Sequence, residues 1–221
     1  MPADHYIDFY KNLHPPYPLP HKIEWLNPQK DPSVMKVITS FFQKYYNDNE
    51  PRTILLGINP GRFGAGVTGV NFTAPKQLTN FCKIDHPFKL QSEISAEFIY
   101  EVICSYGGPD IFYSKFFIGS ICPLGFIKEG RNINYYDDKE LLQTVEPFII
   151  ESMNTLLSVP YNKEVVYCIG GEKNYKYLNR INSKHQWFKS IEVLAHPRFI
   201  MQYKRKQKEI YMNGYLDLLG K

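Results

Sequence analysis

Four short, almost uninterrupted apolar runs constrain the fold of this chain more than any other feature. They are TILLGI from Thr53, KFFIGSI from Lys115, EVVYCI from Glu164 and SIEVLA from Ser190. A strand with one face in water alternates apolar and polar residues, whereas a strand covered on both faces is apolar nearly throughout. We therefore expect four strands in a sheet that is covered on both sides.

Five segments with apolar residues at helical spacing lie around these runs. They are SVMKVITSFFQKYYND, EISAEFIYEVICSY, PFIIESMNTLLS, EKNYKYLNRI and QKEIYMNGYLDLL. Ser33 is a good cap for the first, and Pro147, at the start of the third, suits the first turn of a helix. Alternation of strands and helices predicts a three-layer α/β/α sandwich with a central four-stranded, mainly parallel sheet.

The length of the chain favours one domain. Its 221 residues, 43% of them hydrophobic, suffice for one well-filled core. We expect a single domain over residues 1–221 and a monomer. Residues 1–32, rich in proline and aromatic residues, are expected to form an irregular arm on the surface.

The cysteines and the N-terminus indicate the compartment. Cys82, Cys104, Cys122 and Cys168 lie far apart, and no pair has the spacing of metal ligands, so we expect buried free thiols in a reducing compartment. The first 20 residues lack the apolar centre of a signal peptide, and no later run reaches membrane-spanning length. The sequence thus predicts a cytoplasmic protein without a cysteine-bound metal or a membrane partner. No cofactor or other metal is expected either.

Polar residues stand where three of the predicted strands end. Asn59 follows the first run, Ser120 lies near the end of the second, and His196 follows the fourth. Ligands of such sheets bind beyond the carboxyl ends of the strands. We therefore expect these three residues to converge on one edge of the sheet.

The loop after the first strand is rich in glycine, and residues 57–72 read GINPGRFGAGVTGVNF. It has neither the Lys-Ser/Thr ending of a P-loop nor the GxGxxG spacing of a dinucleotide-binding loop. An isolated Asn-Pro pair would most often only begin a turn. The complete pattern is more informative than that pair.

Residues 57–72 resemble the first motif of the uracil-DNA glycosylase superfamily. The resemblance is closest to the SMUG-type branch, the single-strand-selective monofunctional uracil-DNA glycosylases, whose motif reads GMNPGxFG and then TGVxF. EISAEFIYEVI, CPLGF from Cys122, and GRN from Gly130 resemble later family segments, and HPR from His196 stands at the place of the second motif. The resemblance runs from about Arg52 to the C-terminus.

This resemblance implies a monofunctional DNA glycosylase of base excision repair that hydrolyses the N-glycosidic bond of uracil and leaves an abasic site. It implies that Asn59 positions the attacking water and that His196 donates a hydrogen bond to uracil O2 as negative charge develops there. Phe72 is expected to stack on the extruded base. No lysine stands at a motif position where a Schiff base would form, so we expect no strand cleavage.

The glycines of the loop are expected to shape the base pocket. Gly57, Gly61 and Gly64 let the backbone approach a flat ring closely. Ile58 and Phe63 belong to the same motif and are expected to contact the base. A glycine at position 61 also leaves room for a substituent on C5, so 5-hydroxymethyluracil is an expected second substrate.

A basic segment follows His196. Five basic residues and no acidic one lie between Arg198 and Lys208. Such a run is usually a solvated helix face, but an enzyme that extrudes a base must also fill the gap in the duplex. We expect single- or double-stranded DNA as the partner, at the nucleoid of a bacterial-type cell. The residues expected to form a wedge are Arg198, Phe199, Ile200 and Met201. Those expected to contact phosphates are Lys204, Arg205, Lys206 and Lys208.

Several positions depart from the family pattern. Ser120 stands where the family carries an asparagine that reads the pyrimidine, and a hydroxyl makes a smaller and less selective contact than an amide. Arg62 and Asn71 stand where relatives usually carry proline, and the second motif reads HPRF instead of HPSPR. Either Asn71 and Asn132 compensate for Ser120, or main-chain groups read the base alone.

Two other functions remain open at this stage. A non-catalytic binder of single-stranded or damaged nucleic acid would keep the basic segment and Phe72 without turnover. A glycosylase with a preference for a deaminated purine would also fit the weaker reading of a pyrimidine by Ser120.

Overall fold

The computed structural model describes the whole chain, Met1–Lys221, and its centre is a four-stranded parallel sheet. The strands lie in the order β3-β2-β6-β7. They span Arg52–Gly57 (β2), Phe116–Ser120 (β3), Tyr161–Ile169 (β6) and Ser190–Leu194 (β7). Each coincides with one of the four apolar runs, so the predicted α/β fold with a four-stranded parallel sheet is confirmed.

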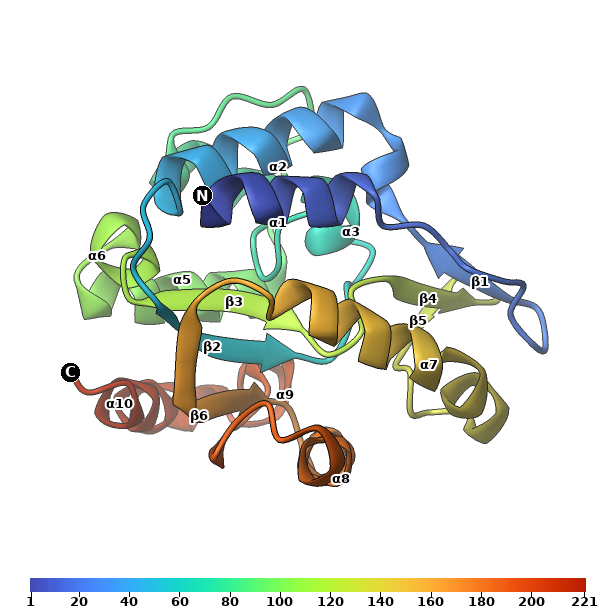
Figure 1. Ribbon diagram of the computed structural model, residues 1–221. Coiled ribbons are helices and arrows are strands. Elements are labelled where there is room, and N and C mark those ends of the chain that lie inside the picture. Colours follow the sequence, from blue (N-terminus) through green and yellow to red (C-terminus); the bar gives the residue numbers. More distant parts are fainter.

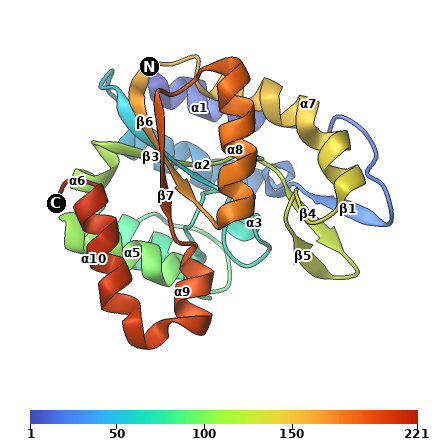
Figure 2. The same ribbon diagram turned by 90° about the horizontal axis from the view of Figure 1, so that it is seen from below.

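Helices cover both faces of this sheet (Figure 1; Figure 2). The longer ones are α1 (Pro2–Lys11), α2 (Pro32–Tyr45), α5 (Ile94–Tyr106), α6 (Pro109–Tyr113), α7 (Lys139–Leu156), α8 (Glu172–His185), α9 (Pro197–Tyr203) and α10 (Lys208–Leu218). Further helical segments are η1 (Pro28–Lys30), α3 (Ala65–Thr68), α4 (Pro75–Gln77), η2 (Leu78–Cys82) and η3 (Arg205–Gln207).

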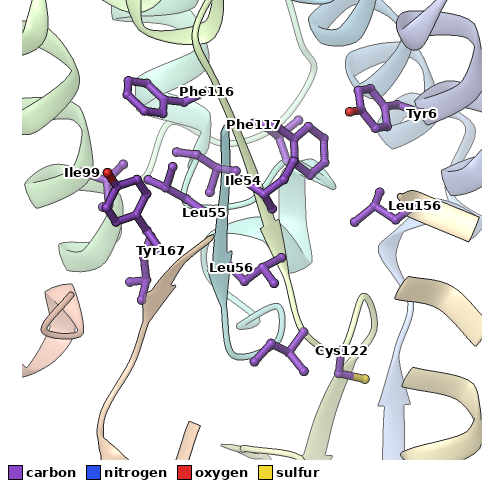
Figure 3. Close-up of a cluster of buried hydrophobic side chains, with 14 of the residues drawn as sticks. Tyr6, Ile54, Leu55, Leu56, Ile99, Phe116, Phe117, Cys122, Leu156 and Tyr167 are labelled. Carbon is purple, nitrogen blue, oxygen red and sulfur yellow. The ribbon is translucent and has the colours of Figure 1, made fainter. Parts of the chain in front are cut away.

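Successive side chains of β3 show how the sheet joins the two helical layers. Phe117 stacks on Tyr6 of α1, with ring centroids 4.5 Å apart, whereas Phe116 meets Tyr106 of α5 edge to face at 5.3 Å. Figure 3 shows Tyr6 on the side of Phe117 and Ile99 of α5 on the side of Phe116. Apolar residues at both odd and even positions are therefore needed along the strand, as the uninterrupted run indicated.

A second, antiparallel sheet lies beyond the carboxyl ends of β2 and β3 (Figure 1). It contains β1 (Ile23–Leu26), β4 (Gly125–Lys128) and β5 (Arg131–Ile133) in the order β1-β4-β5. The turn between β4 and β5 consists of Glu129 and Gly130, both with positive φ, which suits a two-residue hairpin. This sheet was not expected from the sequence, and it forms one wall beside the site described below.

The prediction of an irregular arm over residues 1–32 is wrong. Residues 2–11 form α1, and Tyr6, Phe9 and Tyr10 are buried on one face of it. Their spacing of three and four residues is that of a helix, and the prolines that suggested an arm lie mostly beyond its end. Strand β1 then adds to the second sheet.

Two smaller expectations also need correction. The helix expected from Pro147 begins at Lys139, because Asp138 caps it by accepting hydrogen bonds from the main-chain N–H groups of residues 140 and 141, and Pro147 lies inside it. Cys104 is exposed, whereas Cys82, Cys122 and Cys168 are buried as expected. None of the helices has the length and apolar character required to cross a membrane.

Candidate active site

A cavity of about 760 Å³ opens at the carboxyl edge of the central sheet. The end of β3 and the loops that follow β2, β6 and β7 line it, together with residues from the second sheet. The predicted site residues that line this cavity are Gly57, Ile58, Asn59, Gly61, Phe63, Gly64, Asn71, Phe72, Ser120, Asn132, His196, Arg198 and Phe199. The expected convergence of Asn59, Ser120 and His196 is thus present in the structure.

Three main-chain groups hold the amide of Asn59 in one orientation, and one of them is the carbonyl of the adjacent Pro60, to which Nδ2 of Asn59 donates at 3.4 Å. The Asn59 Oδ1 accepts a hydrogen bond from the N–H of Tyr135 at 3.1 Å, and its Nδ2 donates to the carbonyl of Ile133 at 3.3 Å. Because an N–H can only donate and a carbonyl can only accept, the two ends of the amide cannot be exchanged. An oxygen with a remaining lone pair is therefore fixed at the cavity.

His196 is neutral at physiological pH. It caps α9 through its Nδ1, which accepts a hydrogen bond from the N–H of Arg198 at 3.1 Å. Burial, with a smaller contribution from the charge of Arg198, lowers the pKa of His196 to about 4. Since Nδ1 is the acceptor, Nε2 carries the proton and is the donor that remains for a ligand.

Phe72 lies beside His196, with ring centroids 6.0 Å apart and planes inclined at 51°. Its φ of 51° is unusual for a residue with a side chain. A Cβ on Gly57 would lie 2.8 Å from Cε2 of this ring. The flat ring that Gly57 allows the backbone to approach is therefore that of Phe72.

Ser120 and Asn71 are both buried at the cavity wall, and both already bond to the protein. The Ser120 hydroxyl donates to the carbonyl of Cys122 at 2.9 Å, so its oxygen can only accept from a ligand. Asn71 donates from Nδ2 to the hydroxyl of Tyr10 at 3.3 Å. The N-terminal helix therefore contacts a residue of the cavity wall.

Asn132 joins the glycine-rich loop to the second sheet. Its Oδ1 accepts from the N–H of Arg62 at 3.3 Å, and its Nδ2 lies 3.3 Å from the place of a Cβ on Gly61. The Arg62 guanidinium also donates to the carbonyl of Gly130 and lies 4.6 Å above the ring of Phe63. Arg62 thus attaches the loop to the hairpin instead of entering the cavity.

The basic segment divides into exposed and buried parts. Arg198 and Phe199 are exposed and line the cavity. Outside the cavity, Arg205 and Lys206 are exposed and Lys204 is partly buried. The inclusion of Ile200 in the expected wedge is wrong, because this side chain has no exposed surface and anchors α9 in the core. Met201 is partly exposed but packs against the same core.

Sequence reasoning missed several residues that line the cavity. Gly170 and Gly171 follow β6, so the rule that located Asn59 also applies to them. Tyr203, 74% exposed, follows Phe199 by one helical turn, and their ring centroids are 6.0 Å apart. Glu93 lines the cavity too, but its carboxylate caps α5 and accepts from the N–H of Ala96.

The side chains around the cavity are not arranged as metal ligands. No group of three or more His, Cys, Asp or Glu side chains in the structure is placed to hold a metal ion. The functional groups that remain available to a ligand include the oxygens of Asn59 and Ser120, the Nε2–H of His196 and the ring of Phe72. Together they offer acceptors, a neutral donor and a flat apolar face.

Comparison with known proteins shows the family of this chain and a solved structure that resembles it. The chain matches the model of the uracil DNA glycosylase superfamily over residues 43–220. It is similar to the crystal structure of wild-type Pedobacter heparinus SMUG2, with 43% sequence identity and a TM-score of 0.94, over 99% of this chain and 96% of that chain. No curated protein matches the sequence.

Proposed function

This chain belongs to the uracil DNA glycosylase superfamily, and we propose that it hydrolyses the N-glycosidic bond of uracil in DNA and leaves an abasic site. The observation that carries this proposal is the meeting of Asn59, Phe72 and His196 in one cavity. Cleavage of this bond places positive charge on the sugar and negative charge on the departing base. The three residues offer an acceptor for the attacking water, a donor for the departing base and a flat face on which the base can stack.

Phe72 receives the extruded base. A base inside a duplex or a stacked strand must leave the stack before its glycosidic bond can be reached. The Phe72 ring is held from behind by the backbone at Gly57, and it lies 6.0 Å from the imidazole of His196. A base that stacks on this ring therefore lies within reach of the imidazole.

Asn59 orients the attacking water. Its Oδ1 is fixed by the N–H of Tyr135 and keeps a second lone pair, which can accept a hydrogen bond from a water molecule. An amide is a weak base, so it contributes by position more than by removing a proton. This suits a bond that breaks largely before the water attacks.

His196 stabilises the departing base. Its Nε2–H donates to the base O2, on which negative charge accumulates as the bond lengthens. A neutral imidazole can serve here because the transition state needs a hydrogen-bond donor at O2, and the lowered pKa keeps His196 neutral. The fixed orientation at the start of α9 avoids reorganisation during the reaction.

The cavity supports a second substrate and the absence of lyase activity. A Cβ at Gly61 would lie 3.3 Å from Nδ2 of Asn132, so the absence of a side chain at position 61 keeps the space beside Asn132 open for the C5 substituent of 5-hydroxymethyluracil. No lysine lines the cavity, and an amine is needed to form the Schiff base of a lyase. We propose a monofunctional enzyme with both substrates.

The exposed part of α9 contacts the DNA strand outside the cavity. Arg198 and Phe199 stand at the cavity, and Lys204, Arg205 and Lys206 follow in sequence. Cations in this position neutralise phosphates, and exposed aromatic rings stack on neighbouring bases. We propose that the protein acts as a monomer on cytoplasmic DNA.

The test is an excision assay on single- and double-stranded oligonucleotides that carry one uracil, one 5-hydroxymethyluracil or one hypoxanthine. We expect release of free uracil and 5-hydroxymethyluracil, with strand breakage only after alkali. Breakage without alkali would contradict monofunctional chemistry. Binding of uracil DNA without base release would favour a non-catalytic binder, and preferred release of hypoxanthine would favour a glycosylase for deaminated purines.

A further inference from the structure

The orientation of Asn59 depends on a loop that carries no family motif residue with an assigned role. Beyond the carbonyl of the adjacent Pro60, the hydrogen-bond partners of the amide are main-chain groups of residues 133 and 135, at the end of β5 and just after it. A loop before a helix is free to move unless its side chains are anchored. The position of the Tyr135 N–H therefore depends on what holds Tyr135.

Tyr135 is anchored by one buried hydrogen bond. Its side chain has no exposed surface, and its hydroxyl donates to Oδ1 of Asn174 at 2.7 Å. Burial raises the pKa of Tyr135 well above its ordinary value, so the phenol keeps its proton and remains a donor. A buried, short hydrogen bond of this kind restricts both partners.

Asn174 is itself fixed within the opposite wall of the cavity. It has no exposed surface, lies in the first turn of α8, and donates from Nδ2 to Sγ of Cys168 at 3.3 Å. Its Cβ lies 2.7 Å from the place of a Cβ on Gly170. The Asn174 side chain is thus packed directly behind Gly170, which lines the cavity.

We propose that Tyr135, held by Asn174, is a positioning residue for Asn59. The hydrogen bond between the two side chains joins the cavity wall that follows β5 to the wall that follows β6, and it sets the place of the N–H that holds the Asn59 oxygen. The proposal rests on the role given to Asn59 in the proposed function. According to this proposal, efficient excision also depends on Tyr135 and Asn174, two buried residues that do not contact the base.

The neighbouring Tyr177 offers a matched control. Its ring centroid lies 4.8 Å from that of Tyr135, and its hydroxyl is buried without a hydrogen-bond partner. Tyr135→Phe and Tyr177→Phe therefore each remove one buried phenolic oxygen from adjacent rings. Only the first removes a hydrogen bond that leads to Asn59.

The kinetic test measures single-turnover excision rates and dissociation constants on uracil DNA. We expect Tyr135→Phe to slow excision about tenfold, the equivalent of about 1.4 kcal/mol in the barrier, without a change in DNA affinity. Tyr177→Phe should keep the rate of the unmodified protein. In an Asn59→Ala background, Tyr135→Phe should cause no further slowing, because there is no amide left to position.

Three results would overturn the proposal. The first is an excision rate in Tyr135→Phe equal to that of the unmodified protein. The second is that Tyr135→Phe slows excision by the same factor in the Asn59→Ala background as in the unmodified protein. The third is that Tyr177→Phe slows excision as much as Tyr135→Phe does. Thermal unfolding of each variant shows whether a loss of rate reflects a loss of folded protein. If Asn59→Ala itself excises uracil at the full rate, the proposed function of Asn59 fails instead.

A second readout does not depend on activity. The side-chain amide of Asn59 gives two NMR signals, identified by their loss in Asn59→Ala. We expect Tyr135→Phe to shift these signals and speed their exchange with solvent, while Tyr177→Phe leaves them in place. Identical amide signals in both variants and the unmodified protein would contradict the positioning role whatever the excision assay gives.

Discussion

The ring of Phe72 occupies the space that a side chain at Gly57 would need. A Cβ at position 57 would lie 2.8 Å from Cε2 and 3.0 Å from Cζ of that ring. The backbone at Phe72 has a φ of 51°, so the ring is held in place by a conformation that few residues adopt. The absence of a side chain at Gly57, at the end of β2, is therefore required by the position of the Phe72 ring.

Gly57→Ala is expected to displace the Phe72 ring and to slow uracil excision at least tenfold. The added methyl group forces the ring to move toward the cavity, where the base would stack. Gly171→Ala is the control, because Gly171 lines the same cavity and an added Cβ there meets no atom within 4 Å. Single-turnover rates check both variants, and equal rates for the two would contradict the explanation.

Asn59→Asp is expected to be a poorer enzyme than the unmodified protein at neutral pH. One carboxylate oxygen would take the place of Nδ2, 3.3 Å from the carbonyl of Ile133, where two oxygens repel each other. The carboxylate is a stronger base than the amide, but the side chain at position 59 loses the hydrogen bond that orients it. Excision rates at pH 7 provide the test, and an aspartate variant faster than the asparagine enzyme would show that basicity matters more than position.

The rate of excision is expected to show no step near pH 6.5, the ordinary pKa of histidine. The pKa of His196 is lowered to about 4, so the imidazole stays neutral through the whole range above about pH 5. Arg198→Gln should raise this pKa toward its ordinary value, since the charge of Arg198 is a secondary cause of the shift. NMR titration of the His196 ring protons measures both values.

His196 also makes folding stability depend on pH. Because its pKa is lower in the folded protein than in the unfolded chain, the unfolded chain binds more protons between pH 6.5 and about 4. The free energy of unfolding should therefore fall as the pH drops through this range. His196→Asn should show a smaller fall in denaturant titrations at pH 7 and pH 4.5, and identical falls would contradict the lowered pKa.

Two substitutions on α9 should separate DNA binding from stability. Tyr203→Ala is expected to weaken DNA binding about tenfold, since stacking of a base on an aromatic ring contributes about 1–3 kcal/mol, and to leave the melting temperature unchanged. Ile200→Ala should instead lower the free energy of unfolding by about 2–4 kcal/mol, because it leaves a cavity in the core. Fluorescence anisotropy and denaturant unfolding measure the two effects.

The sequence predicts the central sheet well because its signal is local. Each of the four strands contains one of the apolar runs, although β6 begins with polar residues and β7 is partly exposed, and the ends of the runs show where the polar residues of the site follow. Asn59, Ser120 and His196 meet at the cavity because parallel strands bring their carboxyl ends to one edge. No long-range information is needed for this step beyond the alternation of strands and helices.

The second sheet and the partners of the site residues depend on contacts between distant segments. Residues 23–26 pair with residues 125–128, and nothing in either segment alone specifies the other. The bonds of Asn59 to residues 133 and 135 and the burial of Ile200 are likewise set by tertiary packing. Helix α1 is different, since its buried aromatic residues have helical spacing, which the neighbouring prolines obscured.

The most direct test of the central claim is the single-turnover rate of uracil excision by Asn59→Ala, measured with its affinity for uracil DNA. If Asn59 orients the attacking water, the rate should fall by roughly 10²-fold or more while the dissociation constant stays within about twofold. An undiminished rate would contradict the role of Asn59 and, with it, the hydrolytic mechanism built on this cavity.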